Sequence, residues 1–409
     1  MSALPSESPT SIDIRSVYQP IVDLSTRSVT GFEALTRIPD ANGQVSFQDV
    51  LRDAERQNVI VEFDWRCRLT ALRGALAAKF PPDLDLFVNA EPVALDAPAP
   101  RESLALLADA RDVSIVVEIT ERHLMRDPAG LLRAVDHARH WGWRVAVDDV
   151  GADPSSLALL AILRPDVIKL DMCLVQNRST AENAAIVAAV IAESGRTGAT
   201  VVAEGIETEA HEQWALDMGA TLGQGYFYGP PADLPSFAGF TTSRTHSIDQ
   251  STVTVRAPTA VTPYALVSAL GPPRRADDQL LEALENDLLR IAASAGASTI
   301  VLMTVASPGG LAPDREVSLN DIASCVALTA VFGAFLPGDA ARYRAVHIGA
   351  DEPLARERSL VVVSPSFTAA LIALETDAGS YRYALAYDSQ TVLSAATVLL
   401  RRIPVITGS

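Results

Sequence analysis

Side chains that could bind metal follow short apolar segments at several places in this sequence. Segments rich in Val, Ile or Leu run into, or contain, a set of polar residues made up of Glu33, Asn89, Glu118, Asp148, Asp149, Lys169, Asp171, Glu204 and Glu207. When apolar strands alternate with helices in a closed parallel barrel, the residues that follow the strands meet above one rim. Carboxylate and amide oxygens are ligands that Mg²⁺ and Mn²⁺ prefer. The pattern therefore predicts a divalent-metal site at the C-terminal rim of a barrel.

The elements that would position these residues are predicted between residues 17 and 240. Strand-like and helical segments alternate there at a near-regular period, and no Asn-Gly hairpin signal joins neighbouring strands. We therefore expect an α/β fold, a modified TIM-type (β/α)8 barrel with parallel strands. Residues 1–16 are polar and are expected to be a disordered tail, whereas 241–263, rich in Ser, Thr and Pro, is expected to be a linker.

A smaller mixed α/β domain is predicted from residue 264 to residue 409. The sequence pattern favours helices separated by strands, and the predicted helices are Asp278–Ala295, Leu319–Phe332, Phe367–Leu374 and Gln390–Arg401.

Composition and charge restrict the functions that are open to this chain. Its 409 residues carry a formal net charge of −17, which repels nucleic acid at long range and argues against polymeric DNA or RNA as a partner. A small anionic substrate remains possible because bound metal ions can reverse the local charge. The longest mostly apolar stretch, Ala323–Leu336, is too short to span a bilayer, and the first residues contain no signal-like apolar region. We expect a cytoplasmic protein without a membrane partner.

Taken in order, the motifs of the first domain resemble the EAL-domain phosphodiesterases, which hydrolyse cyclic di-GMP to the linear dinucleotide pGpG with magnesium or manganese. The resemblance extends from about Val17 to Pro231 and consists of YQPI, EALTR, FVN, EITE, DDVG, PDVIKLD, EGIE and QGY. Eight motifs in the order of the family are far more specific than any one of them. The resemblance implies a hydrolase that acts on cyclic di-GMP and forms a homodimer.

The resemblance also implies a role for each matching residue. The implied ligands of two Mg²⁺ or Mn²⁺ ions are Glu33, Asn89, Glu118, Asp148 and Asp149. Two such ions roughly 3.5–4 Å apart can clamp a phosphodiester and activate a water molecule. The implied catalytic residues are Glu33, Glu204 as proton acceptor, and Lys169, which would orient the water and offset phosphate charge. The implied substrate contacts are Gln19, Leu35, Arg37, Asp171 and Gln224, and the implied supporting positions around the metals are Glu121, Glu207 and Asp171.

Three stretches depart from the pattern of this family. In the loop after Asp149, Val150 replaces a Phe, Asp153 replaces the second Gly and Pro154 replaces a Tyr. Because Pro restricts the backbone and Asp tolerates positive φ less readily than Gly, we expect this loop to differ in conformation. Elsewhere Glu91 stands in place of a Ser, and Pro230 in place of an Arg. None of these changes removes a metal ligand, so we expect activity, and the altered loop leaves open the alternative of a slow or conditionally active enzyme.

The second domain resembles the DICT sensory domain over about Ala276–Ile403, through REVSLNDIA, LVVVSPSFTAALIA and YALAYDSQTVLSAATVLLRRI. This resemblance implies an unknown ligand or protein partner and, by analogy, an effect on the dimer or loop state of the barrel. Two alternatives to the enzyme remain open. One is a receptor that binds cyclic di-GMP without hydrolysis and signals through the C-terminal domain, and the other is an unrelated metal-dependent barrel such as an enolase-like enzyme.

Overall fold

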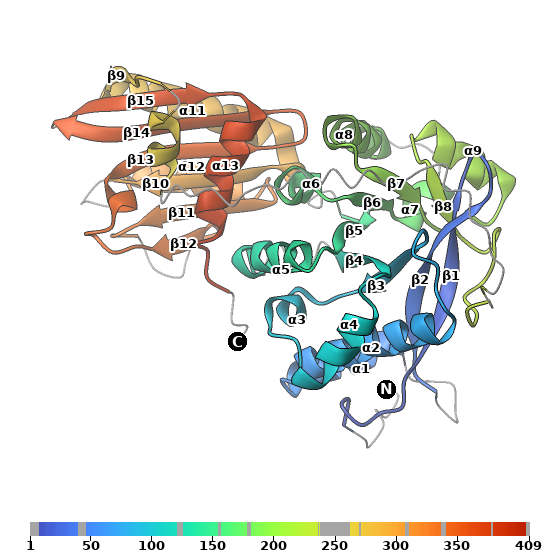
Figure 1. Ribbon diagram of the computed structural model, residues 1–409. Coiled ribbons are helices and arrows are strands. Elements are labelled where there is room, and N and C mark those ends of the chain that lie inside the picture. The colour runs from blue at the N-terminus through green and yellow to red at the C-terminus, as the bar shows by residue number, and fades with distance from the viewer. Residues whose placement is uncertain are drawn as a thin grey trace.

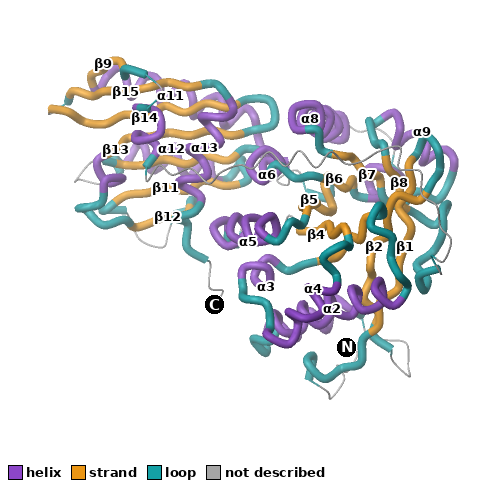
Figure 2. The backbone as a smooth tube through the Cα atoms, in the orientation of Figure 1, coloured by secondary structure: helices purple, strands orange, loops and turns teal. Residues whose placement is uncertain are grey.

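The chain folds into a barrel and a second, sheet-based domain, seen on the right and on the left of Figure 1. A computed structural model describes residues 8–39, 46–120, 126–153, 157–177, 181–235, 237, 262–269, 271–306, 311–336, 341–377 and 379–405. Figure 2 shows that helices surround the barrel strands and also cover the second sheet. The predicted linker lies almost entirely outside the described residues.

In the described part of the chain, eight strands close into a barrel in the order in which they occur in the sequence. They are β1 (Arg15–Asp23), β2 (Val29–Arg37), β3 (Asp85–Asn89), β4 (Ser114–Thr120), β5 (Arg144–Val150), β6 (Val167–Leu170), β7 (Thr200–Ala203) and β8 (Leu222–Gln224). The barrel interior is packed with Ile21, Phe87, Val116, Ala146, Val167, Val202 and Leu222. This architecture confirms the predicted TIM-type fold, in which the interior is a packed core and the C-terminal rim carries the site.

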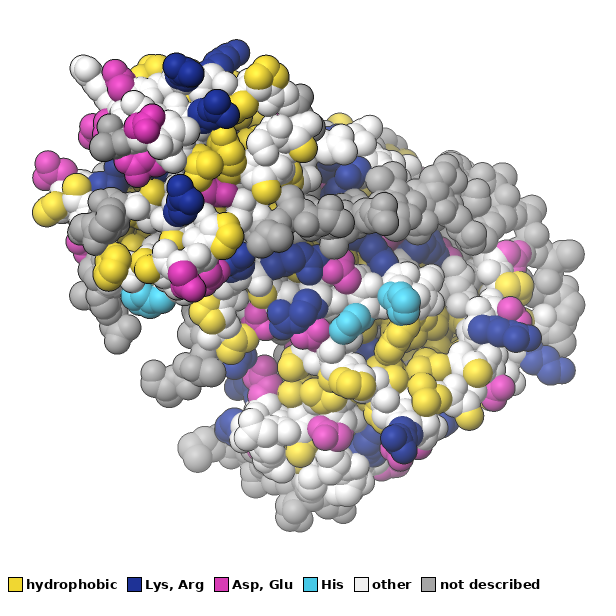
Figure 3. Space-filling model, turned by 60° about the vertical axis from the view of Figure 1, so that its left-hand side comes forward, with side chains coloured by type: hydrophobic (Ala, Val, Ile, Leu, Met, Phe, Trp, Pro, Cys, Tyr) yellow, Lys and Arg dark blue, Asp and Glu magenta, His cyan; other side chains and the backbone are white. Residues whose placement is uncertain are grey.

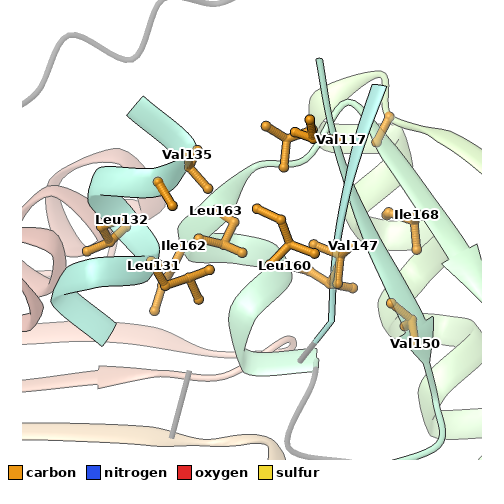
Figure 4. Close-up of a cluster of buried hydrophobic side chains, with 14 of the residues drawn as sticks. Val117, Leu131, Leu132, Val135, Val147, Val150, Leu160, Ile162, Leu163 and Ile168 are labelled. Atoms are coloured by element: carbon orange, nitrogen blue, oxygen red, sulfur yellow. The ribbon is translucent and has the colours of Figure 1, made fainter. Parts of the chain in front are cut away.

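Helices connect most of the strands and form the outer layer of the barrel. They are α1 (Phe47–Arg56), α2 (Ile60–Ala77), α3 (Pro92–Asp96), α4 (Leu104–Asp109), α5 (Pro128–His140), α6 (Leu157–Leu163), α7 (Met172–Gln176), α8 (Ala181–Thr197) and α9 (Glu209–Asp217). Figure 4 shows Leu131 and Leu132 of α5 and Leu160 and Leu163 of α6 next to barrel strands whose labelled side chains include Val147. Apolar faces of this kind hold each helix on the barrel.

The expectation of parallel strands throughout is wrong for β1. This strand runs antiparallel to both of its neighbours, β2 and β8, whereas the other neighbouring pairs of the barrel are parallel. The turn between β1 and β2 uses Asp23, whose Oδ1 accepts hydrogen bonds from the backbone N–H groups of Ser25 at 2.9 Å and Thr26 at 2.8 Å. Arg27 completes the turn with a φ of 55°. An Asp side chain thus makes a hairpin here without the Asn-Gly signal.

The expectation of a disordered tail is also wrong for the part of it that the structure describes. Ile12 is buried in a cluster with Val50 and Phe63, and Arg66 donates hydrogen bonds to the backbone oxygens of Pro9 and Ile12 at 2.9 and 2.8 Å. Residues 15 and 16 already belong to β1. The apolar Ile12 within a polar segment is what attaches this segment to α1 and α2.

The second domain is a mixed sheet with the strand order β12-β11-β10-β13-β14-β15-β9. Its elements are α10 (Pro263–Ser268), β9 (Arg274–Asp277), α11 (Asp278–Ala295), β10 (Ile300–Val305), α12 (Pro313–Ala323), β11 (Leu328–Gly333), β12 (Arg344–His347), β13 (Glu357–Val363), β14 (Thr368–Asp377), β15 (Ser380–Ala386) and α13 (Ser389–Leu400). The strands β10, β11 and β12 are parallel, and the remaining neighbours pair antiparallel. This is a mixed α/β domain, as predicted.

Two of the helices predicted in this domain are wrong. Leu319–Phe332 divides into the end of α12 and the buried strand β11, and Phe367–Leu374 belongs largely to β14. β11 and the stretch of β14 up to Leu374 are almost continuously apolar, because α11 and α12 cover one face of the sheet while α10 and α13 cover the other. Without polar residues in alternate positions, a short buried strand has no period that separates it from a helix.

The second domain packs directly on the outer helices of the barrel. Buried residues of α13, including Leu393, belong to the same hydrophobic cluster as Leu157 and Leu160 of α6. Arg401 forms an ion pair of 2.6 Å with Asp136 of α5. In the face shown in Figure 3, basic and acidic side chains are interspersed over both domains. Among the described residues, no helix combines the length and the apolar character needed to cross a membrane.

Candidate metal centre and substrate pocket

Lys169 lies at the centre of a cluster of carboxylates at the C-terminal rim of the barrel. Its Nζ atom is 2.6 Å from Glu118, 2.6 Å from Glu204, 3.0 Å from Asp148 and 3.5 Å from Glu33. These residues come from β2, β4, β5, β6 and the end of β7. Lys169 is only 1% exposed. Strands from around the barrel therefore bring five charged groups to one buried point.

Hydrogen bonds fix the carboxylate of Glu33 within this cluster. Asn89 Nδ2 donates to Glu33 Oε1 at 3.1 Å, and Gln224 Nε2 donates to Glu33 Oε2 at 2.6 Å. Gln224 Nε2 also donates to Gln19 Oε1 at 3.1 Å, and Gln19 Nε2 in turn donates to the backbone oxygen of Gly229 at 3.3 Å. Since both oxygens of Glu33 are held by amides from different strands, its side chain is oriented before any ligand arrives.

A second group of carboxylates lies at the same rim. Asp148, Asp149 and Glu204 each offer an oxygen atom, and these oxygens lie within 4.8 Å of one another. Asp149 has a φ of 55°, a conformation that non-glycine residues seldom adopt. Backbone strain of this kind is concentrated at functional sites, where surrounding structure holds it in place. The strained backbone lets two successive acids, Asp148 and Asp149, contribute to one site.

The electrostatics of the cluster follow from its burial and its crowded charges. Burial opposes the charge of Lys169, but the surrounding carboxylates outweigh it and raise the pKa of this amine well above its ordinary value. Burial and the negative charge of Glu33 raise the pKa of Glu118 well above its ordinary value. Burial raises the pKa of Glu204 to about 8, against the opposing effect of Lys169. The pKa of Glu33 is lowered instead, because Lys169 and the amide donors outweigh its burial.

The residues of this cluster fit a divalent cation. Glu33, Glu118, Asp148, Asp149 and Glu204 bring five carboxylates to the rim, and the ammonium of Lys169 can balance only one of them. Oε1 of Glu118 faces the ammonium of Lys169 at 2.6 Å, whereas its Oε2 is buried without a hydrogen-bond partner among the described residues. An unpartnered carboxylate oxygen of this kind is costly to bury unless a further cation faces it. An all-oxygen set of carboxylates with one Asn suits Mg²⁺ or Mn²⁺.

A pocket of about 780 Å³ opens beside the cluster. Its lining includes all five predicted metal ligands, namely Glu33, Asn89, Glu118, Asp148 and Asp149. Leu35 and Arg37, two of the predicted substrate contacts, line the same pocket. The guanidinium of Arg37 is exposed and donates to the backbone oxygen of Thr36 at 3.0 Å. A pocket of this volume is within the range of small-molecule sites.

Some predicted site residues have other surroundings. Asp171 caps α7 by accepting a hydrogen bond of 2.7 Å from the backbone N–H of Cys173, and Glu207 is exposed near the start of α9. Gln19 does not line the pocket; its contact with the site is the hydrogen bond from Gln224. Glu121 lies outside the described residues.

The pocket also has a wall that the motifs did not reveal. Its lining includes Phe47, Arg52 and Glu55 of α1 and Arg126 just before α5. The sequence offers little signal for these residues, because they lie in ordinary amphipathic or loop segments.

A closed barrel with a cluster of carboxylates at its C-terminal rim places this chain among the α/β-barrel proteins whose rim residues can bind a metal ion. Within that class, the family model of the EAL domain matches residues 6–231, more than half of the chain. The chain belongs to the EAL domain family.

Named relatives give this family assignment its context. RocR of Pseudomonas aeruginosa, named a cyclic di-GMP phosphodiesterase, is 29% identical over 235 residues, which are 56% of this chain and 60% of that protein. Protein y4lL of Sinorhizobium fredii is 32% identical over 222 residues, 52% of this chain and 26% of that protein. Each match therefore covers less than two thirds of the relative. Among solved structures, Klebsiella pneumoniae BlrP1 in a calcium and cyclic di-GMP complex has 30% sequence identity and a TM-score of 0.47, covering 57% of this chain and 59% of that one.

Proposed function

We propose that this protein hydrolyses cyclic di-GMP to linear pGpG in a metal-dependent reaction at the C-terminal rim of its barrel. The observation that carries the proposal is the convergence of Glu33, Glu118, Asp148 and Glu204 on one buried lysine. The adjoining pocket of about 780 Å³ offers room for a small anionic substrate. The name of the relative RocR supports the same substrate.

Five side chains would hold two Mg²⁺ or Mn²⁺ ions in this proposal: Glu33, Asn89, Glu118, Asp148 and Asp149. Bound ions of this kind supply positive charge to a phosphodiester and lower the pKa of a water molecule. The protein's own contribution is to keep mutually repelling carboxylates together, and the ammonium of Lys169 does this from within the cluster. The same ammonium adds a positive charge for the phosphate oxygens of the substrate.

Glu204 is the proposed proton acceptor for the attacking water. Its carboxylate lies at the rim, 2.6 Å from Lys169 Nζ, and is partly exposed. A raised pKa favours retention of the proton that Glu204 takes from water. Gln224 and Asn89 hold Glu33 in one orientation, while Arg37 has the planar guanidinium that suits a phosphate.

For the second domain we propose a DICT-like sensory role toward an unidentified ligand or protein, in a cytoplasmic homodimer. The packing of α13 against α6 supports an influence on the barrel, because α6 follows the segment that carries Asp148 and Asp149. The alternative of a receptor that binds cyclic di-GMP without hydrolysing it rests on the altered loop residues Val150 and Asp153.

Incubation of the purified chain with cyclic di-GMP and Mg²⁺ or Mn²⁺, followed by chromatography for pGpG, tests the proposal. We expect turnover by the wild type and its loss in Glu33→Ala and Asp148→Ala, because each change removes a proposed metal ligand. A chelator should abolish turnover in the same way. Binding of cyclic di-GMP without any product would refute the proposed hydrolysis and support the alternative of a receptor. The absence of both binding and product would refute the enzyme and the receptor alike.

A further inference from the structure

Four arginines line the pocket, and they differ in how strongly other side chains hold their guanidinium groups. Of the described residues, Arg37, Arg52, Arg68 and Arg126 line it. Arg68 is buried and forms an ion pair with Asp64 of its own helix, and Arg52 forms one with Asp49. Arg126 has a longer contact, 3.4 Å from its Nη1 to Glu55 Oε1, and its side chain is 60% exposed. Besides Arg37, Arg126 is therefore the guanidinium best placed to exchange its contact for a ligand.

The backbone of Arg126 is held by the second domain. Arg344 of β12 donates a hydrogen bond of 2.7 Å from Nη2 to the backbone oxygen of Arg126, across 218 positions of the sequence. In Figure 1, β12 is the edge strand on the side of the second sheet where α5 lies. The other terminal nitrogen of Arg344, Nη1, is buried and has no hydrogen-bond partner among the described residues. Through the bond from its Nη2, Arg344 joins the second domain to the backbone just before α5.

Further contacts join the second domain to α5 and to the residues just before it. Asp127, the residue after Arg126, caps α5 by accepting a hydrogen bond of 2.8 Å from the backbone N–H of Gly130. Its charge also acts on Arg344, although burial is the stronger effect and lowers the pKa of that guanidinium. At the other end of α5, Arg401 pairs with Asp136 at 2.6 Å. The second domain therefore contacts both the residue Arg126, which precedes α5, and the C-terminal half of α5 itself.

We propose that Arg126 contacts the second phosphate of cyclic di-GMP and that Arg344 is the positioning residue that holds Arg126 for this contact. The inference rests on the proposed function, because it assumes that substrate. Cyclic di-GMP has two phosphodiester groups, and only one of them can face the carboxylate cluster during cleavage. The other must lie farther out in a pocket whose wall includes Glu55 and Glu91, where a phosphate needs a nearby cation. The guanidinium of Arg126 supplies it with paired N–H donors.

Steady-state kinetics on the full chain test this inference with four variants. Arg126→Gln and Arg344→Gln remove the two guanidinium groups singly, and a double variant removes both. Arg342→Gln is the matched control, since Arg342 lies two residues before Arg344 and its side chain does not line the pocket. Chromatography for pGpG gives kcat and KM, and titration calorimetry with cyclic di-GMP in EDTA gives affinity without turnover. Circular dichroism establishes that each variant is folded.

We expect Arg126→Gln to raise KM and the dissociation constant by about fivefold to tenfold with little change in kcat, as for a contact made equally in ground and transition states. Arg344→Gln should raise KM about threefold, and the double variant should resemble Arg126→Gln, because the two residues act through one contact. Arg342→Gln should behave as the wild type. An unchanged KM in Arg126→Gln, or fully additive effects on KM in the double variant, would overturn the inference. If the wild type still turned over cyclic di-GMP, either result would leave the proposed function intact. A wild type without turnover would instead refute that function.

Discussion

Replacement of Lys169 by Met should destabilise the metal-free barrel and make its stability depend on divalent metal. The ammonium is 1% exposed and lies within 3.0 Å of carboxylate oxygens from Glu118, Asp148 and Glu204. Removal of one partner from a buried ionic cluster costs about 3–5 kcal/mol, because the remaining charges lose their compensation. Met fills a similar volume, so the cavity adds little to this cost. For a domain of this size, we expect a fall in Tm of roughly 10 °C.

The size of this effect should depend on pH. In Lys169→Met, the buried carboxylates can avoid repulsion only by binding protons, so their pKa values in the folded state rise above those in the unfolded state. Acids with raised folded pKa values contribute stability that is complete below the unfolded pKa and is lost as the pH rises through the folded pKa. The raised pKa of Lys169 keeps the amine charged in the wild type over the same range. The difference between the two proteins should therefore be small near pH 5 and large near pH 8.

Thermal melts of wild type, Lys169→Met and Lys79→Met in EDTA, at pH 5 and pH 8, provide the assay. Lys79 is the other lysine of the chain and is exposed, which makes it the matched control. Addition of Mg²⁺ or Mn²⁺ should raise the Tm of Lys169→Met more than that of the wild type, since the metal binds the folded state and replaces the lost charge. If Lys169→Met melted within 2 °C of the wild type in EDTA at pH 8 (a margin of about 1 kcal/mol), Lys169 could not be what compensates the carboxylates.

Two further predictions concern residues outside this cluster. Burial raises the pKa of Glu357 to about 7, so the stability contributed by its protonated form is complete below pH 4.5 and is lost as the pH rises through 7. Glu357→Gln should accordingly raise the Tm at pH 8 but not at pH 4.5, and equal shifts at both pH values would contradict this view. A Cβ atom at Gly225 would lie 2.0 Å from the backbone oxygen of Ile206, so Gly225→Ala should destabilise the barrel by roughly 3 kcal/mol, at the upper end for overpacking. Gly195→Ala, with open space around its Cβ, is the control in the same denaturant titration, and equal stability of both variants would refute the steric argument.

The positions of the site residues could be predicted because they depend on local rules. In β6, Val167 lies in the barrel interior and Ile168 in the outer cluster, so Lys169, two residues after Val167, must point inward again. Position on the strand thus places Lys169 at the rim. Its central place among four carboxylates depends on how strands from the whole barrel align, and no local pattern contains that information.

The structural errors of the prediction have a physical cause of their own. The strand β11 and the apolar part of β14 up to Leu374 are covered by helices on both faces, so polar residues do not alternate with apolar ones as they do in a half-exposed strand. The wall formed by α1 and Arg126 could not be predicted for a different reason. It is built by contacts such as Arg344 to Arg126, which join residues 218 positions apart. Contacts between residues so far apart in the sequence form only in the assembled fold, so neither segment carries a local sequence pattern that would predict them.

The reversed direction of β1 has a consequence for the site. In the antiparallel register, Gln19 is the partner of Glu33 on β2, and Ile21 is the partner of Gln224 on β8. This brings Gln19 Oε1 to 3.1 Å from Gln224 Nε2, the same nitrogen that donates to Glu33 at 2.6 Å. Had β1 run parallel to β2, its side chains would meet the rim in the opposite order, and Gln19 would have no reason to lie beside Gln224. The β1–β2 hairpin, which the sequence pattern did not predict, therefore helps to orient Glu33. Glu33 is both a proposed metal ligand and a proposed catalytic residue.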